Sequence, residues 1–230
     1  MAALQKLGML VFCIVLSAPV VAGQNLSRYR NFELGTSTAS ILKETRSEPS
    51  NLKTLYTTPE LIQTLQWNRQ AFFSSTSRDV KDPVNAIRFD FYADQLVRIV
   101  AKYDNRLLEG LTTADLIEVI SEAYGRSSTP DETVVVSSYG NYTDDQKVLA
   151  SWTNGENTFS LYRSSLGGEF GMVVSSDRLE LLAAQSVREA RRLEVAAAPQ
   201  REIERLEKEA ETRRLAEEKA RSLNKPNFRP

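Results

Sequence analysis

The pattern closest to a catalytic motif is Ser40-Ile41-Leu42-Lys43, which fits the Ser-x-x-Lys spacing. On a helix this spacing places a lysine amine one turn from a serine hydroxyl, as a serine nucleophile requires. The Lys-Thr-Gly and Ser-Asp-Asn patterns that accompany it in enzymes of that class are missing from the sequence. The preceding run, Gly35-Thr36-Ser37-Thr38-Ala39, lacks the second glycine of a Gly-x-Ser-x-Gly elbow. We therefore interpret these hydroxyls as the cap of a helix.

The chain of 230 residues has no histidine, and its only cysteine is Cys13. This composition excludes Ser-His-Asp and Cys-His catalysis and imidazole metal sites. It also excludes disulfides within the chain after Cys13. The remaining acid–base groups are carboxylates, which cluster as Asp90 with Asp94, Asp104 with Glu109, and Asp144 with Asp145. None of them has calcium-loop spacing, and no glycine-rich phosphate loop is present. We expect solvated turns, with Asp144 and Asp145 in a loop, and a protein that is not an enzyme and binds no metal or cofactor.

The first 23 residues have the pattern of a secretory signal peptide. Lys6 precedes the apolar residues 7–16, Pro19 follows them, and small residues at 20–23 suit cleavage after Ala22 or Gly23. Because the apolar stretch is shorter than the ~20 residues needed to cross a bilayer, we favour cleavage over an uncleaved anchor. The mature protein is expected to be exported, either periplasmic or secreted, without a transmembrane span.

The mature chain has two regions of different composition. Residues 24–176 carry 15 basic and 19 acidic groups and 17 of the 19 aromatic residues, so the packed core belongs there. Residues 177–230 are charged at 24 of 54 positions. Nucleic acid is disfavoured as a partner because the body is acidic and exported.

Three helices are expected in the body. One follows Gly35-Thr36-Ser37, and a second begins at Thr58-Pro59-Glu60, with Thr58 as the N-cap and proline at the first helical position. The third begins with a capping pattern at Thr112-Thr113-Ala114-Asp115 and ends near Tyr124-Gly125.

Alternating apolar residues predict strands over 87–92 and 97–103 with a turn at 93–95, and over 148–153 and 157–162 around Asn154-Gly155. Further strands are expected over 134–136 and 170–175. The predicted fold class is α+β: an antiparallel meander sheet with helices on one face, and a long charged C-terminal helix.

An internal repeat is suggested by an offset of 75 residues. This offset aligns residues 35–43 with residues 110–118, and each of these segments is a capped helix start that opens with glycine. The same offset places residues 96–100 near residues 171–175, so that two predicted strands also align. We therefore divide the body into two tandem αα-β units, 24–106 and 107–176, with coincidental similarity of two capped helices as the alternative.

This order of elements, with a glycine and a hydroxyl residue opening each unit, resembles the BamE/SmpA small-protein fold over residues 30–175 at most. Two such units in tandem resemble the β-lactamase-inhibitor-protein arrangement. The resemblance implies a non-catalytic partner of other proteins in the cell envelope, or an inhibitor that binds enzyme surfaces through its sheet. The chain departs from both families because it has neither a lipidated cysteine at the mature start nor a cysteine pair.

Residues 177–222 are predicted to be helical, with a break or kink at Pro199, and residues 223–230 to be disordered. Apolar residues of the first part, such as Leu179 and Val187, recur at helical spacing and suit docking on the body. After Pro199 the apolar stripe is thin, which favours a solvated helix over a coiled coil.

The leading hypothesis is an exported, non-catalytic protein-binding module of the cell envelope or extracellular space. The alternatives are an inhibitor of a secreted hydrolase and a carboxylate-dependent hydrolase, which would need two carboxylates converging in one pocket. The partner and the oligomeric state stay open. The candidate partner-binding residues are Trp67, Phe72, Phe73, Tyr142, Trp152, Ile203 and Leu206. For the aromatic residues among them, the alternative to an exposed binding surface is packing under the sheet.

Overall fold

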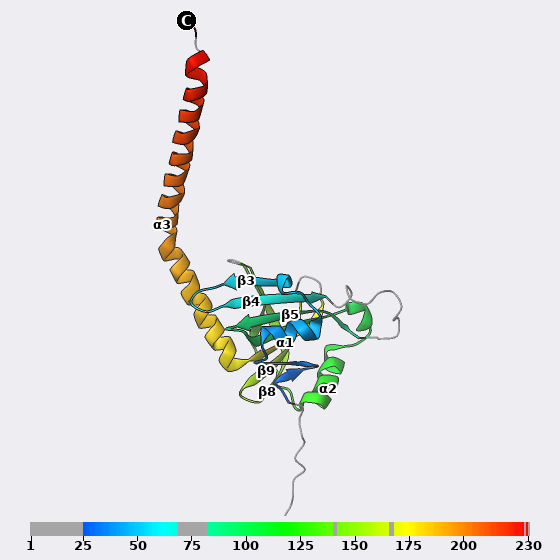
Figure 1. Ribbon diagram of the computed structural model, residues 1–230. Helices are drawn as coiled ribbons and strands as arrows, with labels where there is room; N and C mark the ends of the chain where they lie inside the picture. Colours follow the sequence, from blue (N-terminus) through cyan, green and yellow to red (C-terminus); the bar gives the residue numbers. More distant parts are fainter. Residues whose placement is uncertain (1–24, 69–81, 140–141, 166–167, 228, 230) are drawn as a thin grey trace, which may run out of the picture.

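The computed structural model describes residues 25–68, 82–139, 142–165, 168–227 and 229. Within them, eight strands form one antiparallel sheet in the order β3-β4-β5-β6-β10-β9-β8-β7, and β1 (Arg28–Tyr29) pairs with β2 (Phe32–Glu33) separately (Figure 1). The sheet confirms the predicted α+β class. Its strands are β3 Leu52–Tyr56, β4 Ile62–Asn68, β5 Val84–Tyr92, β6 Gln95–Tyr103, β7 Thr133–Tyr139, β8 Tyr142–Thr153, β9 Asn157–Arg163 and β10 Phe170–Ser176.

Two short helices begin where the capping residues predict. In α1 (Thr38–Thr45) the Ser37 side chain accepts from the Ser40 backbone N–H. In α2 (Thr113–Tyr124) Thr112 and Asp115 form a reciprocal capping box, and Gly125 ends the helix. Both helices contribute to the main core, α1 through Ile41 and α2 through Leu116.

The main core lies on the face of the sheet that α1 and α2 cover. Every second residue of the central strands points into it, as the two-residue period of a strand requires. The central side chains, Ile87, Phe89, Ile99, Phe159 and Leu161, are fully buried. Burying each of them stabilises the fold by about 1.5–3 kcal/mol relative to an exposed position.

The two halves of the sheet are related by an approximate two-fold rotation about the β6–β10 pair. Each half is a helix followed by four strands that pair in chain order, and the last strands of both halves meet in the middle. In that pair Ile99 stands opposite Val174, which lies 75 residues further along the chain. The N-caps Ser37 and Thr112 have the same offset. An approximate two-fold axis therefore passes between Ile99 and Val174.

One predicted helix is wrong. Thr58-Pro59-Glu60 forms a bend, and the residues after it form β4 rather than a helix. The apolar spacing of Ile62 and Leu65 is compatible with a helix, but β4 is hydrogen-bonded to β3 on one side and to β5 on the other, and this pairing overrides local propensity. Each unit is thus one helix and four strands, not two helices and a sheet.

The prediction of a loop at Asp144 and Asp145 is also wrong. Both residues lie inside β8, which starts at Tyr142 and pairs with β7 there. The register puts Asp144 opposite Ser137 and Asp145 opposite Val135. Pairing with β7 thus holds these two charged residues in a strand, although their propensity alone would assign them to a turn.

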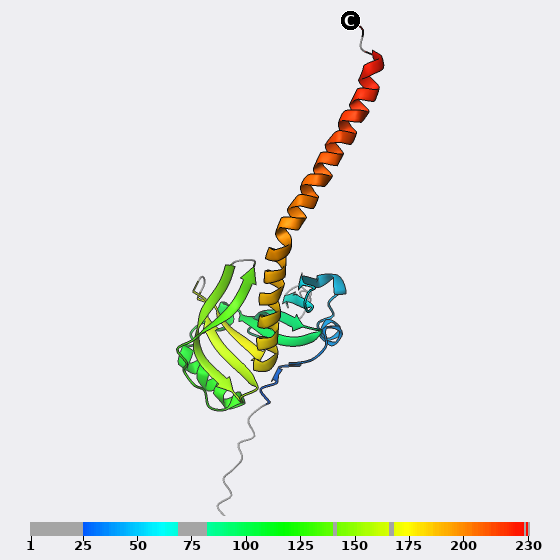
Figure 2. The same ribbon diagram turned by 90° about the vertical axis from the view of Figure 1, so that its left-hand side faces the viewer.

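The long helix α3 (Asp177–Asn224) starts directly after β10 and lies on the face of the sheet opposite α1 and α2 (Figure 2). Its first turns contact β5, β6 and β10, where Leu179 and Ala190 are buried. From residue 191 to residue 227 every position is exposed, and from residue 195 onward the helix projects away from the body (Figure 1).

Of the break or kink predicted at Pro199, the break is wrong, because α3 continues through the proline. Its axis bends between the part that covers the sheet and the projecting part (Figure 1). Proline has no N–H to donate and its ring crowds the preceding turn. The missing N–H leaves the Val195 carbonyl without its usual donor, and the Arg201 guanidinium donates to the neighbouring Glu194 carbonyl oxygen at 2.8 Å. The predicted disorder after residue 222 also differs from the structure, where a 3-10 turn, Lys225–Asn227, follows the helix.

Candidate binding site under the C-terminal helix

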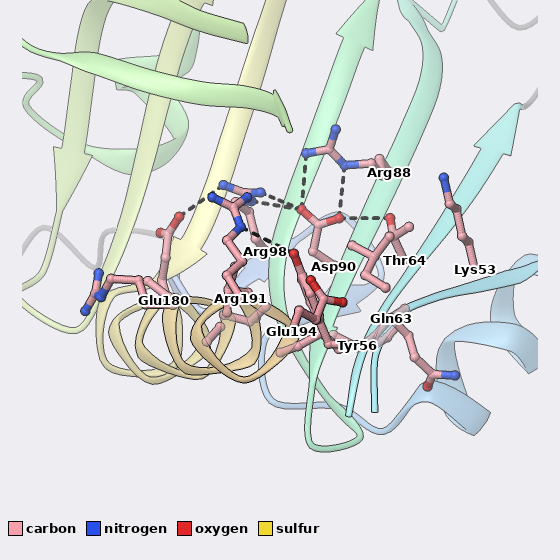
Figure 3. Close-up of a pocket in the computed structure, with 18 residues that line it drawn as sticks. Lys53, Tyr56, Gln63, Thr64, Arg88, Asp90, Arg98, Glu180, Arg191 and Glu194 are labelled. Carbon is pink, nitrogen blue, oxygen red and sulfur yellow. Dashed lines mark hydrogen bonds and ion pairs between the residues drawn. The ribbon is translucent and has the colours of Figure 1, made fainter. Parts of the chain in front are cut away.

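A cavity of about 550 Å³ lies between α3 and the first half of the sheet (Figure 3). We call it the α3 cavity. Its lining comes from β3, β4, β5 and β6 on one side and from residues 180–194 of α3 on the other. The volume lies within the range of about 300–1,000 Å³ that small-molecule sites occupy. Most of the wall is apolar, with side chains that include Leu55, Ile62, Val97, Ala183, Ala184 and Val187.

A row of polar side chains crosses four strands on the cavity side. Lys53 stands opposite Thr64, Thr64 opposite Asp90, and Asp90 opposite Arg98. We call these four residues the polar row. Because cross-strand partners point to the same face of a sheet, the register alone brings these groups from β3, β4, β5 and β6 under α3.

A β-bulge shapes the end of this row. Asp90 pairs with Arg98 and the next residue, Phe91, pairs with Leu96, so Val97 is an extra residue in β6. An extra residue locally breaks the alternation of side chains between the two faces. Val97 and Arg98 accordingly both line the α3 cavity.

Asp90 is the centre of the polar contacts. Its Oδ1 accepts from Thr64 Oγ1 at 2.9 Å and from Arg88 Nε at 3.0 Å, and its Oδ2 accepts from Arg98 Nε at 2.9 Å. Arg88 adds a second contact to Oδ2 at 3.2 Å, so its fork holds both carboxylate oxygens. The side chains of Arg88, Asp90 and Arg98 are only 14–17% exposed.

These contacts determine the ionisation of Asp90. Burial by itself would raise the pKa of this carboxyl, but the Arg98 and Arg88 guanidiniums overcome that effect and lower the pKa below its ordinary value of 3.8. Burial would likewise lower the pKa of Arg98, and Asp90 and Glu180 raise it instead. The group is therefore a fixed carboxylate between two fixed cations at neutral pH.

The helix side of the cavity adds further charged groups. Arg98 Nη1 donates to Glu180 at 3.2 Å, which ties the first turn of α3 to β6. Arg191 Nε donates to the Tyr56 hydroxyl at 3.3 Å, a contact that links α3 to the edge strand β3. Figure 3 shows Glu180 and Arg191 reaching toward the sheet from two separate turns of the helix.

The cavity is positively charged although the domain around it is acidic. Its lining contains five basic and three acidic residues, whereas residues 24–176 carry 15 basic and 19 acidic groups. The basic residues are Lys53, Arg88, Arg98, Arg188 and Arg191. The arrangement suits an anion with an apolar body.

The second half of the sheet shows that the fold does not require this row. The residue 75 positions after Arg98 is Val173, which stands opposite Ser160 on β9, and Ser160 stands opposite Ser151 on β8. Uncharged side chains therefore occupy the positions equivalent to Arg98, Asp90 and Thr64. Both serines are only 5% exposed. The same topology is thus built without buried charge, so the polar row is specific to the cavity.

The carboxylates singled out in the sequence do not form a joint site. Asp94 accepts from the Thr38 backbone N–H at 3.1 Å, and Asp104 caps the short turn Asn105–Leu107. Asp144 binds Gln146 within β8. Only Asp90 lies in the α3 cavity. Ser40 contacts the capping Ser37 hydroxyl at 3.0 Å, in agreement with a capping role.

The aromatic candidates are scattered. Trp152 is wrong as a surface residue, because it is 1% exposed and its indole N–H lies within hydrogen-bonding distance of Gly125 O (3.0 Å) and Ser121 Oγ (3.2 Å). Trp67 is half-buried against Phe32, with ring centroids 6.1 Å apart. Phe72 and Phe73 lie outside the described residues, as does the predicted signal peptide over residues 1–23, and the side chain of Tyr142 is not described. Ile203 and Leu206 are half exposed, at 50% and 51%.

The sequence argument missed Arg88, Arg98, Thr64 and Glu180 as site residues. A signal was present: Arg88 and Asp90 occupy alternate positions of one strand, and Arg98 follows in the partner strand. Alternation places Arg88 and Asp90 on the same face, but which residue of the next strand joins them depends on the bulge at Val97.

No known protein family matches this chain, and neither does any curated protein or solved structure. The resemblance to BamE/SmpA-type units therefore stays a prediction. Within the described residues no helix is long and apolar enough to cross a bilayer.

Proposed function

We propose that the protein is an exported, non-catalytic binding module of the cell envelope or extracellular space, which contacts a protein partner through the projecting part of α3. The observation that carries the proposal is the exposure of every residue from 195 to 227 on a helix that leaves the body. A single domain gains little stability from such a segment, whereas a helix with apolar positions is a common binding element.

Ion pairs stabilise the projecting helix in solvent, and three apolar residues on it share one face. Arg205 pairs with Glu202 at 2.6 Å and also with Glu209, and such pairs stabilise isolated helices. Ile203, Leu206 and Ala210 follow one another at helical spacing, so they share one face. We call these three residues the apolar strip.

The α3 cavity bears on the alternative of a carboxylate-dependent hydrolase. It does bring Asp90 of β5 near Glu180 and Glu194 of α3. A carboxyl that acts as a general acid near neutral pH needs a raised pKa. The pKa of Asp90 is lowered instead, and its oxygens are already occupied by Thr64 and two arginines. This geometry favours binding over proton transfer.

The apolar strip is tested with point variants of the tagged mature chain. The wild type and the double variant Ile203→Glu/Leu206→Glu are used to capture proteins from envelope extract and from culture medium. Leu215→Glu is the matched control, because Leu215 is 53% exposed on a different face of the same helix. We expect the double variant to lose a protein that both the wild type and the control retain. Equal capture by all three would rule out this role for the helix.

Export is tested separately by mass spectrometry of the native protein. We expect a mature N-terminus at Gly23 or Gln24 in a periplasmic or medium fraction. Recovery from the cytosol with residues 1–23 intact would refute the localisation without bearing on the apolar strip.

A further inference from the structure

We infer that the α3 cavity is a binding site for an anionic amphiphile, a molecule with an acidic head and an alkyl body. This site is distinct from the apolar strip and does not depend on the proposed function. The inference stands on three features of the described residues: the shape of the cavity, its charge, and the donors that Arg88 and Arg188 retain.

The shape comes from small side chains on the helix. Ala183, Ala184 and Val187 line the cavity on the helix side with short side chains. The cavity is open to solvent on one side, where Leu55, Ala184 and Arg188 are exposed, and its volume of about 550 Å³ lies in the range of small-molecule sites. The mainly apolar wall fits an alkyl chain better than it fits water.

The head group has a specific counterpart in Arg88. A guanidinium has five N–H donors, and Asp90 accepts from Nε and one terminal nitrogen of Arg88. The other terminal nitrogen, Nη1, has no acceptor among the described residues, and Figure 3 shows it pointing away from Asp90. The side chain is 14% exposed. A carboxylate or sulfonate head at the Arg88 end of the cavity, on the side of Arg88 away from Asp90 and α3, would satisfy these donors.

Arg188 provides a second cation on the helix side. It lines the cavity, is exposed, and pairs with no carboxylate in the part of the chain that the structure describes. A cationic head would meet five basic groups against three acidic ones and is disfavoured. The site therefore selects by charge as well as by apolar contact.

The test uses isothermal titration of the full mature chain with dodecanoate below its micelle concentration. Dodecanol and dodecyltrimethylammonium serve as neutral and cationic probes of the same chain length. We expect saturable binding of one dodecanoate per chain, and at least roughly tenfold weaker binding of the other two, the difference that one charge-assisted hydrogen bond provides. Equal affinity for the cationic probe, or no saturable binding of dodecanoate, would overturn the inference.

Three variants locate the site. Ala183→Leu fills the cavity and is expected to weaken binding at least roughly tenfold, while Ala216→Leu on the exposed part of the helix leaves it unchanged. Arg88→Gln and Arg188→Gln each remove a cation, and Arg214→Gln is their exposed control. Thermal unfolding is measured for each variant, and Arg188→Gln provides an exposed substitution if Arg88→Gln alters the fold. Binding that is insensitive to both Ala183→Leu and Arg188→Gln would place the ligand elsewhere.

A protein segment is the competing occupant. A peptide of alternating leucine and glutamate is therefore titrated alongside the lipid-like probes. If the peptide binds more tightly than dodecanoate and Ala183→Leu abolishes its binding, the cavity recognises an acidic polypeptide and the amphiphile assignment is wrong.

Discussion

Replacing Asp90 by asparagine probes the polar row with almost no change in shape. The variant keeps an acceptor for Thr64 but removes the negative charge between Arg88 and Arg98, whose side chains are 14% and 17% exposed. At about 4 Å, two unit charges attract by about 4 kcal/mol where the effective dielectric constant is near 20. The cost of desolvating the ions offsets part of this attraction, and Glu180 still faces Arg98. We expect a net loss of about 3 kcal/mol, the lower end of the range for breaking a buried ion pair.

The assay is urea and thermal unfolding of wild type and Asp90→Asn at several pH values. For a chain of this size, a loss of about 3 kcal/mol lowers the unfolding temperature by about 6–12 °C. Because the folded-state pKa of Asp90 is lowered from 3.8, its contribution is fully present above that value and disappears as the pH falls below it. The difference between the two proteins should therefore be constant from pH 5 to pH 7 and shrink below about pH 3.8.

The exposed pair of Glu202 with Arg205 is the control. Both side chains are more than half exposed, so Glu202→Gln should leave the unfolding midpoint unchanged. A loss below about 1 kcal/mol for Asp90→Asn at pH 7 would refute the reasoning, since leaving two buried cations with one carboxylate must cost more than that. A loss of the same size at pH 3 and pH 7 would show that the effect is not one of charge.

Two further predictions concern packing. The ring of Tyr162 lies over Gly171, its cross-strand neighbour, so Gly171→Ala should displace the ring and destabilise the protein by about 1–3 kcal/mol, with a changed near-ultraviolet circular dichroism spectrum; an unchanged spectrum and stability would contradict this contact. Trp152→Phe removes the indole donor that faces Ser121 Oγ and Gly125 O and should cost about 1–3 kcal/mol in urea unfolding. Trp67→Phe should cost less, because the Trp67 N–H has no acceptor among the described residues, and an equal loss in both variants would contradict the hydrogen-bond argument.

Local signals predicted the hairpins and caps well. Asn154-Gly155 marks the turn between β8 and β9, and Ala93 and Asp94, both with positive φ, close the turn between β5 and β6. The Thr112–Asp115 capping box also forms as its spacing predicts. Each of these features is decided within a few residues, so the sequence alone contains the necessary information.

Features that depend on distant partners were not predictable in the same way. The β4 strand forms because β3 and β5 are available on both sides, and Trp152 is buried because α2 provides acceptors 27 and 31 positions away. The α3 cavity requires the register of four strands, the bulge at Val97 and the path of the helix at once. No sequence window contains all three.

The pairing of Ile99 with Val174 has a consequence for the first half of the chain on its own. Strand β6 is the last strand of that half and meets β10 in an antiparallel register centred on this pair. A polypeptide that stopped after Tyr103 would leave β6 as an open edge, and a second copy could satisfy it with its own β6 around the same centre. The single chain thus contains the geometry of a symmetric homodimer in which each subunit would correspond to one half of the sheet.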